Sequence, residues 1–461
     1  AALLAGCGGP TPPERPNILV AVADDWSWPH AGAAGYEAVS TPVFDRVAAD
    51  GVLFGNAFAT APSCSPSRAA LLTGRYHWEL EQGANLWGTL PAKFDVYPNL
   101  LEKQGYHVGF SRKGWGPGKI GPNGRERNPA GKRYRNFGLF LRARPKGTPF
   151  CFWFGSRDPH RMYGPRARLN RSLDCDDARL PACLPESRTV REDLCNYLFE
   201  VQRFDRDLGN VLAELESIGE LHNTIVIVTS DNGMPFPRCK ANLYDTGTHV
   251  PLVMRWGSRW GQGRRIDEFV SLCDLAPTLL DVLGMPAPEE MSGRSLLPLL
   301  QPPGPDTSPA RRDHVITGRE RHICAQGNTL KGYPSRASRT SDFLYIKNFE
   351  PQRWPVGTPP AYRDVDRSPT RRYMLHHRDE PGVKELFELA FGKRPAEELY
   401  DLRSDPGQLV NVAAAEGYAD IKQRLATRLM RRLKRTGDPR AFGNGEVFDT
   451  YAYYMIKRIH Q

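Results

Sequence analysis

Short, unbroken apolar runs recur along the first two thirds of the chain. A strand that is covered on both faces needs no polar positions, so such runs predict buried strands rather than strands at a surface. The clearest runs are 17–23, 52–58, 150–154, 224–229 and 251–255. Several of them end abruptly in polar or acidic residues, which marks where each strand reaches an edge of the sheet.

Amphipathic segments alternate with these runs. Thr41 before Pro42 is a favourable helix start, the apolar residues that follow share one face, and Gly51 is a favourable stop. Further helices are predicted at 67–72, ended by Gly74, and at 191–218, 275–283 and 421–433. Alternating strands and helices predict an α/β fold whose mainly parallel sheet is sandwiched by helices.

The alternation stops at a proline-rich stretch, 301–309. Beyond it lie shorter alternating segments such as 343–346, together with a basic amphipathic helix, which predict a smaller C-terminal α+β domain. A chain of 461 residues also exceeds the size at which one hydrophobic core usually stops growing. The predicted organisation is a terminal segment at 1–16, a main domain at 17–300 and a smaller domain at 310–461.

Charge changes this picture only slightly. The 62 Lys and Arg residues against 52 Asp and Glu residues give a net charge of +10, which favours a polyanionic ligand over a merely soluble surface by a small margin. No zinc finger, basic zipper or RNA-binding signature is present, so nucleic acid is not the expected partner.

The first residues resemble the end of a bacterial lipoprotein signal, because small and apolar residues precede Cys7. This pattern predicts export to the periplasm or cell surface, with a lipid anchor at Cys7 and a proline-rich tether at 8–16. No other apolar run is long enough to span a bilayer.

Nine cysteines are present. Setting aside Cys7 and Cys64 leaves an odd number, so at least one thiol is predicted to be free. Cys175, Cys183 and Cys195 lie close enough in the sequence for one disulfide, which an exported protein can form.

Acidic pairs follow two of the predicted strands. Asp24-Asp25 comes directly after 17–23, and Asp231-Asn232 follows the strand at 224–229. In a parallel sheet both pairs emerge at the carboxyl edge, and their hard oxygen atoms suit Ca²⁺ or Mg²⁺. Capping of turns is the alternative interpretation, and spacing alone does not separate the two.

Cys64 stands between a predicted strand and a short helix, where a helix N-terminus favours an anion. A lone cysteine is more often a small buried apolar residue. Here, however, Cys64-Ser65-Pro66-Ser67-Arg68 matches C-x-P-x-R, the signal by which sulfatase cysteines are oxidised to formylglycine, and the match continues through Gly74.

These motifs identify a resemblance to the type I, formylglycine-dependent sulfatases of the alkaline phosphatase superfamily. The resemblance runs from Asn17 to about Val412 and is closest to the heparan N-sulfatase (sulfamidase) branch and its bacterial relatives. It is also carried by the segments 230–237 (SDNGMPFP), 271–278 (SLCDLAPT) and 398–402 (ELYDL). It implies an alkaline phosphatase-like catalytic domain at 17–300, and a C-terminal domain that contributes to the substrate pocket.

The resemblance also implies roles for individual residues. One calcium ion would be held by Asp24, Asp25, Asp231, Asn232 and the modified Cys64. Catalytic roles would fall to Cys64, to Arg68 beside it, to the sulfate-contacting Lys113 and Lys240, and to the active-site His160. The sequence departs from the family at Trp115, where a histidine thought to help release sulfate usually stands; His30 and His249 are the candidates to replace it.

The implied activity is hydrolysis of sulfate, as an O-sulfate ester or an N-sulfate, from a sulfated oligosaccharide or polysaccharide. Basic and aromatic residues at 318–345 and 353–378 fit a wall that holds such a substrate. A formylglycine-generating enzyme is the expected partner during maturation. Two alternatives stay open: an inactive sulfatase-like surface protein that binds sulfated glycans, and a phosphoesterase of the same superfamily, although the extra histidine ligands typical of the latter are not found near Asp231.

Overall fold

The structure is a computed structural model that describes residues 15–163, 173–257, 259–260, 263–301, 312–327 and 329–455. The predicted anchor at Cys7, nearly all of the tether at 8–16 and most of the proline-rich stretch at 301–309 lie outside the described residues.

A large mixed sheet forms the centre of the molecule, with the strand order β4-β3-β5-β1-β6-β7-β2-β8. Every neighbouring pair is parallel except those made by β7, which runs antiparallel to both β6 and β2. The prediction of a mainly parallel sheet is therefore confirmed. The strands are β1 (Asn17–Ala23), β2 (Val52–Phe58), β3 (His107–Arg112), β4 (Lys132–Tyr134), β5 (Phe150–Gly155), β6 (Thr224–Ser230), β7 (Leu252–Arg255) and β8 (Arg264–Ser271).

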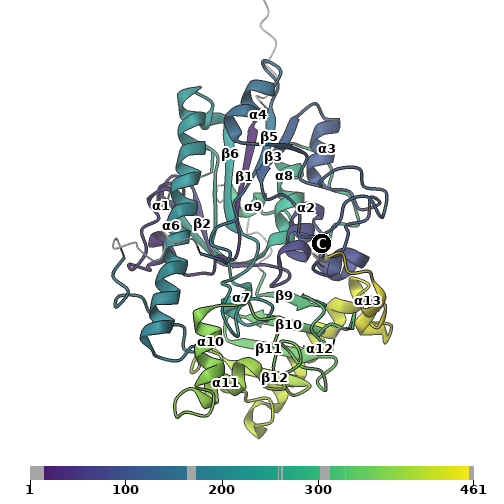
Figure 1. Cartoon of the computed structure of the whole chain (residues 1–461). Coiled ribbons are helices and arrows are strands. Elements are labelled where there is room, and N and C mark those ends of the chain that lie inside the picture. Colours follow the sequence, from purple (N-terminus) through teal and green to yellow (C-terminus); the bar gives the residue numbers. More distant parts are fainter. Residues whose placement is uncertain are drawn as a thin grey trace, which may run out of the picture.

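Helices cover both faces of this sheet, as Figure 1 shows. Alternate residues of β1 point to opposite faces. Ile18, Val20 and Val22 belong to the core under α2, α3 and α8, whereas Leu19, Ala21 and Ala23 belong to the core under α1, α4 and α6. This alternation explains why the strand carries no polar position. The helices of this domain are α1 (Pro42–Ala49), α2 (Cys64–Thr73), α3 (Tyr97–Lys103), α4 (Phe137–Ala143), α6 (Arg188–Ser217), α7 (Asp245–Thr248), α8 (Leu275–Val282) and α9 (Leu297–Leu300).

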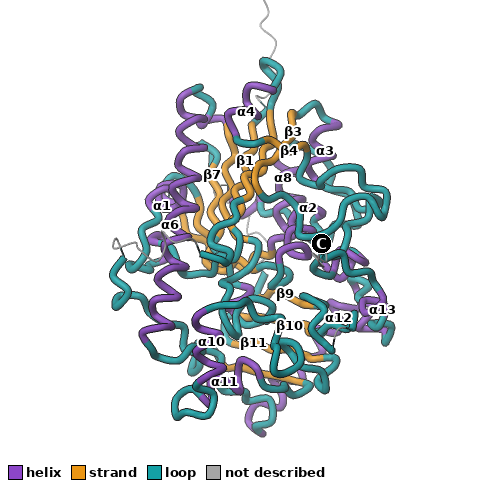
Figure 2. Tube along the Cα trace, in the orientation of Figure 1, coloured by secondary structure: helices purple, strands orange, loops and turns teal. Residues whose placement is uncertain are grey.

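A second, smaller sheet follows in the sequence and lies below the first in Figure 2. It is antiparallel, with the order β12-β11-β10-β9, and confirms the predicted C-terminal α+β architecture. Leu425, Leu429 and Leu433 lie on one face of α12 and pack against this sheet. The elements are β9 (His314–Arg319), β10 (Ser335–Thr340), β11 (Phe343–Asn348), β12 (Glu397–Asp401), α10 (Pro369–His376), α11 (Lys384–Phe391), α12 (Ala419–Arg435) and α13 (Val447–Thr450).

Short 3₁₀ helices connect the larger elements: η1 (Gly32–Ala34), η2 (His77–Glu79), η3 (Glu81–Ala84), η4 (Leu221–Asn223), η5 (Leu272–Asp274), η6 (Glu416–Tyr418) and η7 (Pro439–Phe442). Among the described residues, no helix is both long enough and apolar enough to cross a membrane.

Helix α2 begins at Cys64, three residues before the predicted start. Ser63 is extended, with φ −159° and ψ 135°, and Pro66 falls in the first helical turn. A proline is tolerated there because the first N–H groups of a helix have no partner inside the helix. Gly74, at φ 67°, ends the helix as predicted.

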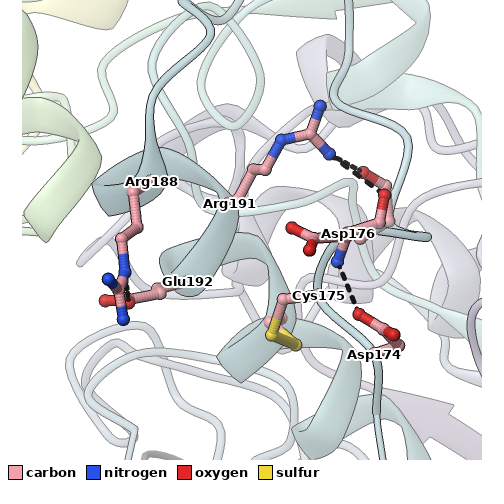
Figure 3. Close-up of a disulfide and its surroundings, with 8 residues drawn as sticks. Asp174, Cys175, Asp176, Arg188, Arg191 and Glu192 are labelled. Atoms are coloured by element: carbon pink, nitrogen blue, oxygen red, sulfur yellow. Dashed lines mark hydrogen bonds and ion pairs between the residues drawn. A yellow bond between two sulfur atoms is a disulfide. The ribbon is translucent and has the colours of Figure 1, made fainter.

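One disulfide joins Cys175 to Cys195 across 20 positions, as expected for one pair among the three nearby cysteines. It attaches the loop before α6 to the first part of that helix (Figure 3). In the same view, the guanidinium of Arg191 donates a hydrogen bond of 3.4 Å to the carbonyl of Asp176, which fixes the loop a second time.

Candidate active site

The two acidic pairs lie side by side at the carboxyl edge of the large sheet. Strands β1 and β6 are parallel neighbours, and Ala23 pairs with Ser230, so the residues that follow them must meet. The backbone N–H of Asp25 donates to Asp231 Oδ1 at 3.1 Å, and Asn232 Nδ2 donates to Asp25 Oδ1 at 2.8 Å. These bonds cross between two segments more than 200 residues apart and hold the carboxylates in a fixed arrangement.

Cys64 completes this cluster from the start of α2. Its Sγ lies 3.4 Å from Asp24 Oδ1, and one ligand atom each of Asp24, Asp25, Cys64 and Asp231 lies within 4.8 Å of the others. The Cys64 residue is only 3% exposed. The oxygen-rich strand ends and the cysteine therefore form one site.

Three cationic side chains surround the carboxylates, one for each. Lys113 Nζ lies 2.6 and 2.7 Å from the two carboxylate oxygens of Asp24. Lys240 Nζ lies 2.7 Å from Asp25 Oδ2. Arg68 Nε donates to Asp231 Oδ2 at 2.6 Å.

The guanidinium of Arg68 is completely buried and also holds the chain that follows β3. One of its terminal nitrogens donates to the carbonyls of Lys113 and Gly114, at 3.1 and 3.0 Å. Because Arg68 lies one helical turn after Cys64, it links the cysteine, the acidic cluster and the lysine-bearing loop.

His160 follows β5, the other neighbour of β1, and its ring faces the same cluster. Its Nε2 lies 3.9 Å from Asp25 Oδ2, while its Nδ1 faces the carbonyl of Arg161. Arg161 in turn makes a two-pronged ion pair with Asp193 of α6, at 2.7 and 2.9 Å. This pair anchors the loop and leaves the half-buried imidazole directed at the site.

Burial and charge perturb these groups in opposite directions. Burial raises the pKa of Asp24, but Lys113, His160 and Arg68 outweigh it, so the pKa falls below its usual value. Burial raises the pKa of Asp25, as do its acidic neighbours, and this pKa lies above its usual value despite Lys240 and His160. Of the two carboxylates, the charged form is therefore favoured at Asp24 and disfavoured at Asp25.

The site fits a hard divalent cation. It offers three carboxylates, and the buried Oδ1 of Asn232 has no hydrogen-bond partner among the described residues. Oxygen ligands of this kind suit calcium, and a cation would supply both the missing partner of Asn232 and the charge that Asp25 needs.

Two residues of the small domain reach the site without having been singled out by sequence. Asp366 Oδ2 lies 3.6 Å from Lys240 Nζ. His322 Nδ1 lies 2.8 Å from the Oγ of Ser63, next to Cys64. Burial lowers the pKa of His322 to about 3, with Lys240 acting in the same direction, so its ring is neutral near pH 7. Both residues fall inside the basic segments 318–345 and 353–378, where no periodic pattern distinguishes them.

Trp115 is buried beside the site, and its backbone N–H donates to Asn128 Oδ1 at 3.0 Å. The two histidines expected to replace the family histidine lie elsewhere. His30 contacts the hydroxyl of Tyr197 at 3.2 Å, and His249 Nε2 contacts the carbonyl of Gly55 at 2.9 Å. Among the described residues, neither ring hydrogen-bonds to the acidic cluster.

A cavity of about 700 Å³ opens over these groups. Asp24, Lys113 and His160 lie in its wall, together with Trp115 and Trp87. Its size suits one or two sugar rings, and its wall places cationic groups beside aromatic surfaces.

Known proteins resemble the chain over most of its length. The profile of the sulfatase family matches residues 16–125 and 132–285. Human N-sulphoglucosamine sulphohydrolase is 30% identical, over 92% of this chain and 91% of its own length. A ulvan-active sulfatase of Formosa agariphila is 28% identical, over 92% of this chain and 81% of its own.

A similar fold occurs in a solved protein in complex with its substrate D-glucosamine-2-N,6-O-disulfate. The TM-score is 0.65 at 20% identity, over 92% of this chain and 98% of that one. Family profile, relatives and fold agree with the motif at Cys64. The chain therefore belongs to the sulfatase family and is a sulfuric ester or sulfamate hydrolase.

Proposed function

We propose that this enzyme removes sulfate, as an O-sulfate ester or an N-sulfate, from a sulfated saccharide, with formylglycine made from Cys64 and one bound calcium ion. The observation that carries the proposal is the position of Cys64 Sγ among three carboxylates, with Arg68, Lys113 and Lys240 around them. A sulfated saccharide is the substrate of the relatives that the chain resembles.

Calcium would be held by Asp24, Asp25, Asp231, Asn232 and an oxygen of the modified residue 64. It would supply positive charge to an anionic substrate and lower the pKa of a nucleophilic hydroxyl. The chain's own contribution is the fixed arrangement of the carboxylates, which hydrogen bonds between the two strand ends maintain.

An unmodified Cys64 is a poor nucleophile in this position. Burial raises the pKa of its thiol well above the ordinary value and outweighs Lys113 and Lys240, which lower it. Formylglycine, as its hydrate, would supply one hydroxyl for attack on sulfur and a second through which sulfate is expelled. The N-terminus of α2 and the Arg68 guanidinium favour negative charge at this point.

The lysines and His160 have distinct tasks. Each lysine ammonium has three N–H donors, and both Lys113 and Lys240 retain a donor for a sulfate oxygen after contacting their carboxylates. We assign proton donation to the leaving oxygen or nitrogen to His160 or Lys240, because both lie beside Asp25.

Export also belongs to the proposal. A lipid anchor at Cys7 would hold the enzyme in the periplasm or at the cell surface, where sulfated polysaccharides are met. A formylglycine-generating enzyme must act on the chain during its maturation.

The test is sulfate release from a panel of defined saccharides: glucosamine with an N-sulfate, glucosamine with a 6-O-sulfate, and their oligosaccharides. The enzyme is produced alongside a formylglycine-generating enzyme, and the mass of the peptide containing Cys64 verifies conversion. We expect release from at least one member, and a loss of at least about 1,000-fold in Cys64→Ser, whose folding is checked by circular dichroism.

Chelation of calcium should also abolish turnover, and added calcium should restore it. If the converted enzyme binds sulfated glycans but releases no sulfate, the chain is a binding protein. If phosphate esters are hydrolysed faster than every sulfated substrate, it is a phosphoesterase.

A further inference from the structure

A second cavity, of about 750 Å³, adjoins the active-site cavity. Arg112, Arg133, Arg157, Asp158 and Arg203 line both cavities, so the two share one wall and form a continuous groove. Tyr134, Arg135 and Asp207 line only the second cavity. Five of its eight lining residues among the described part of the chain are arginines.

The arginines come from neighbouring strands of the large sheet. Arg112 ends β3, Arg133 lies in β4, and Arg157 follows β5. These strands are parallel neighbours on the side of β1 away from β6. The groove therefore leads from the acidic cluster along the sheet edge toward β4.

Two of the guanidinium groups are already neutralised. Arg112 pairs with Asp207 at 2.6 Å. Arg203 pairs with Asp158 and, at 2.8 Å, with Glu200. These ion pairs hold the base of the groove in place, so Arg112 and Arg203 have a structural role.

The other three arginines have no such role. Arg133, Arg135 and Arg157 are exposed, and among the described residues none of them makes an ion pair. Three unpaired guanidinium groups in one concave wall give a positive field that suits an anion able to accept two hydrogen bonds at once, such as a carboxylate or a sulfate.

We propose that this groove is a second anion subsite, which binds a further sulfate or carboxylate of the saccharide chain whose sulfate lies at Cys64. The enzyme then prefers substrates with at least two anionic groups over singly sulfated ones. The inference rests on the proposed function, because the first anion is the sulfate to be cleaved.

A binding experiment tests the subsite without catalysis. The double variant Arg133→Gln/Arg135→Gln is made in a Cys64→Ala chain, leaving Arg157 in place because it precedes the loop of His160. Calorimetry then measures affinity for a disaccharide with one sulfate, for the same disaccharide with a second sulfate, and for one with a uronic carboxylate instead.

We expect the double variant to bind the doubly charged disaccharides at least about 10-fold more weakly, and to weaken binding of the singly sulfated one by a smaller factor, because Arg133 also lines the active-site cavity. The effect should shrink at high salt, since exposed charges are screened. Arg424→Gln, which removes an exposed arginine from α12, is the matched control and should change nothing. A larger loss of affinity for the disaccharide with two sulfates would indicate that the groove binds sulfate. A larger loss for the disaccharide with a carboxylate would indicate that it binds carboxylate.

Kinetics of the converted enzyme give the second readout. In the double variant, KM should rise for doubly charged substrates while kcat stays the same, and the KM of a singly sulfated substrate should rise by a smaller factor. Equal affinities of parent and double variant for all three disaccharides would overturn the subsite. Failure of the converted parent enzyme to release sulfate from any substrate would instead overturn the proposed function.

Discussion

The residue that ties the site together is Arg68, whose guanidinium is completely buried between α2 and the strand ends. It pairs with Asp231 at 2.6 Å and bonds to two backbone carbonyls of the loop that carries Lys113. A lysine has no planar fork with which to reach several acceptors at once. This explains why the motif around Cys64 needs arginine at its last position.

His322 is our candidate for the proton transfer that Trp115 cannot perform under the proposed function. Its neutral ring contacts Ser63, the residue before the nucleophile position, and it is buried. We therefore expect His322→Ala to slow the expulsion of sulfate from the enzyme, and to lower kcat by about 100-fold or more. Rapid-quench kinetics should show a burst of desulfated saccharide followed by slow turnover.

The variant His322→Gln separates proton transfer from positioning, because glutamine retains a hydrogen bond to Ser63 but does not titrate. It should behave like the alanine variant. His314→Ala, at the other end of β9, is the control and should keep normal kinetics. Full activity in His322→Gln would assign the histidine a positioning role only.

Residues of the site differed in how visible they were in the sequence. Asp24, Asp25, Asp231 and Asn232 follow apolar runs, so the geometry of a parallel sheet alone brings them together. Lys240 and His160 stand in irregular loops, and only the resemblance to a family pointed to them. Asp366 and His322 lie among many other charged residues, and their approach depends on how the small domain packs.

At the scale of elements, α2 depends on its terminal glycine. Gly74 has φ 67°, and a Cβ there would lie 2.8 Å from Met291 Sδ and 3.2 Å from Pro277 Cδ. We expect Gly74→Ala to lower the free energy of unfolding by about 1–2 kcal/mol through the left-handed backbone alone, and further through the collision. Urea denaturation measures the change.

A matched glycine separates the two contributions. Gly219 after α6 has φ 70°, but a Cβ there would meet nothing within 4 Å. Gly219→Ala should therefore lower the free energy of unfolding only through the left-handed backbone. If both variants lose the same free energy of unfolding, Met291 and Pro277 move away from the new Cβ without an energetic penalty.

The strands with long apolar runs and the strongly amphipathic helices followed from the sequence, whereas shorter elements such as β3, β4, α3 and α4 did not. The long apolar runs and the 30-residue helix α6 were visible because their periodicity is strong. The antiparallel direction of β7 was not predictable, because a strand of four residues has no pattern that fixes its orientation. The helix α2 begins three residues before the predicted start, because its first turn tolerates Pro66.

At the scale of the whole molecule, stability should fall with acidity because the interior holds uncharged histidines. Burial lowers the pKa of His249 to about 4, and burial lowers that of His30 to about 3, from an ordinary 6.5. Unfolding below pH 6.5 therefore takes up a proton at each ring. Each of these histidines should lower the free energy of unfolding by about 1.4 kcal/mol for every pH unit that the pH falls in this range.

Urea titrations between pH 7.5 and 5 would measure this slope. His249→Gln should make the slope shallower by the contribution of one proton, about 1.4 kcal/mol per pH unit. Adding His30→Gln should reduce the slope by a second, additive contribution. An unchanged slope in both variants would mean that other groups take up the protons.

The docking of the small domain over the sheet edge was not predictable, because it rests on buried contacts between distant segments. Lys240 and Asp366, and likewise Ser63 and His322, meet only through that packing. The two-domain architecture followed from the change in pattern along the chain, but the shape of the groove between strand ends and loops did not.

Under the proposed function, the burial of Cys64 means that conversion of this residue has to precede folding. The recognition segment Cys64-Ser65-Pro66-Ser67-Arg68 is helical and enclosed in the folded chain, so a converting enzyme cannot read it there. Conversion would have to happen while the segment is still extended, because folding encloses it. The yield of active enzyme would then depend on the rate of conversion relative to the rate of folding, and a chain that folds before conversion would be well structured but inactive.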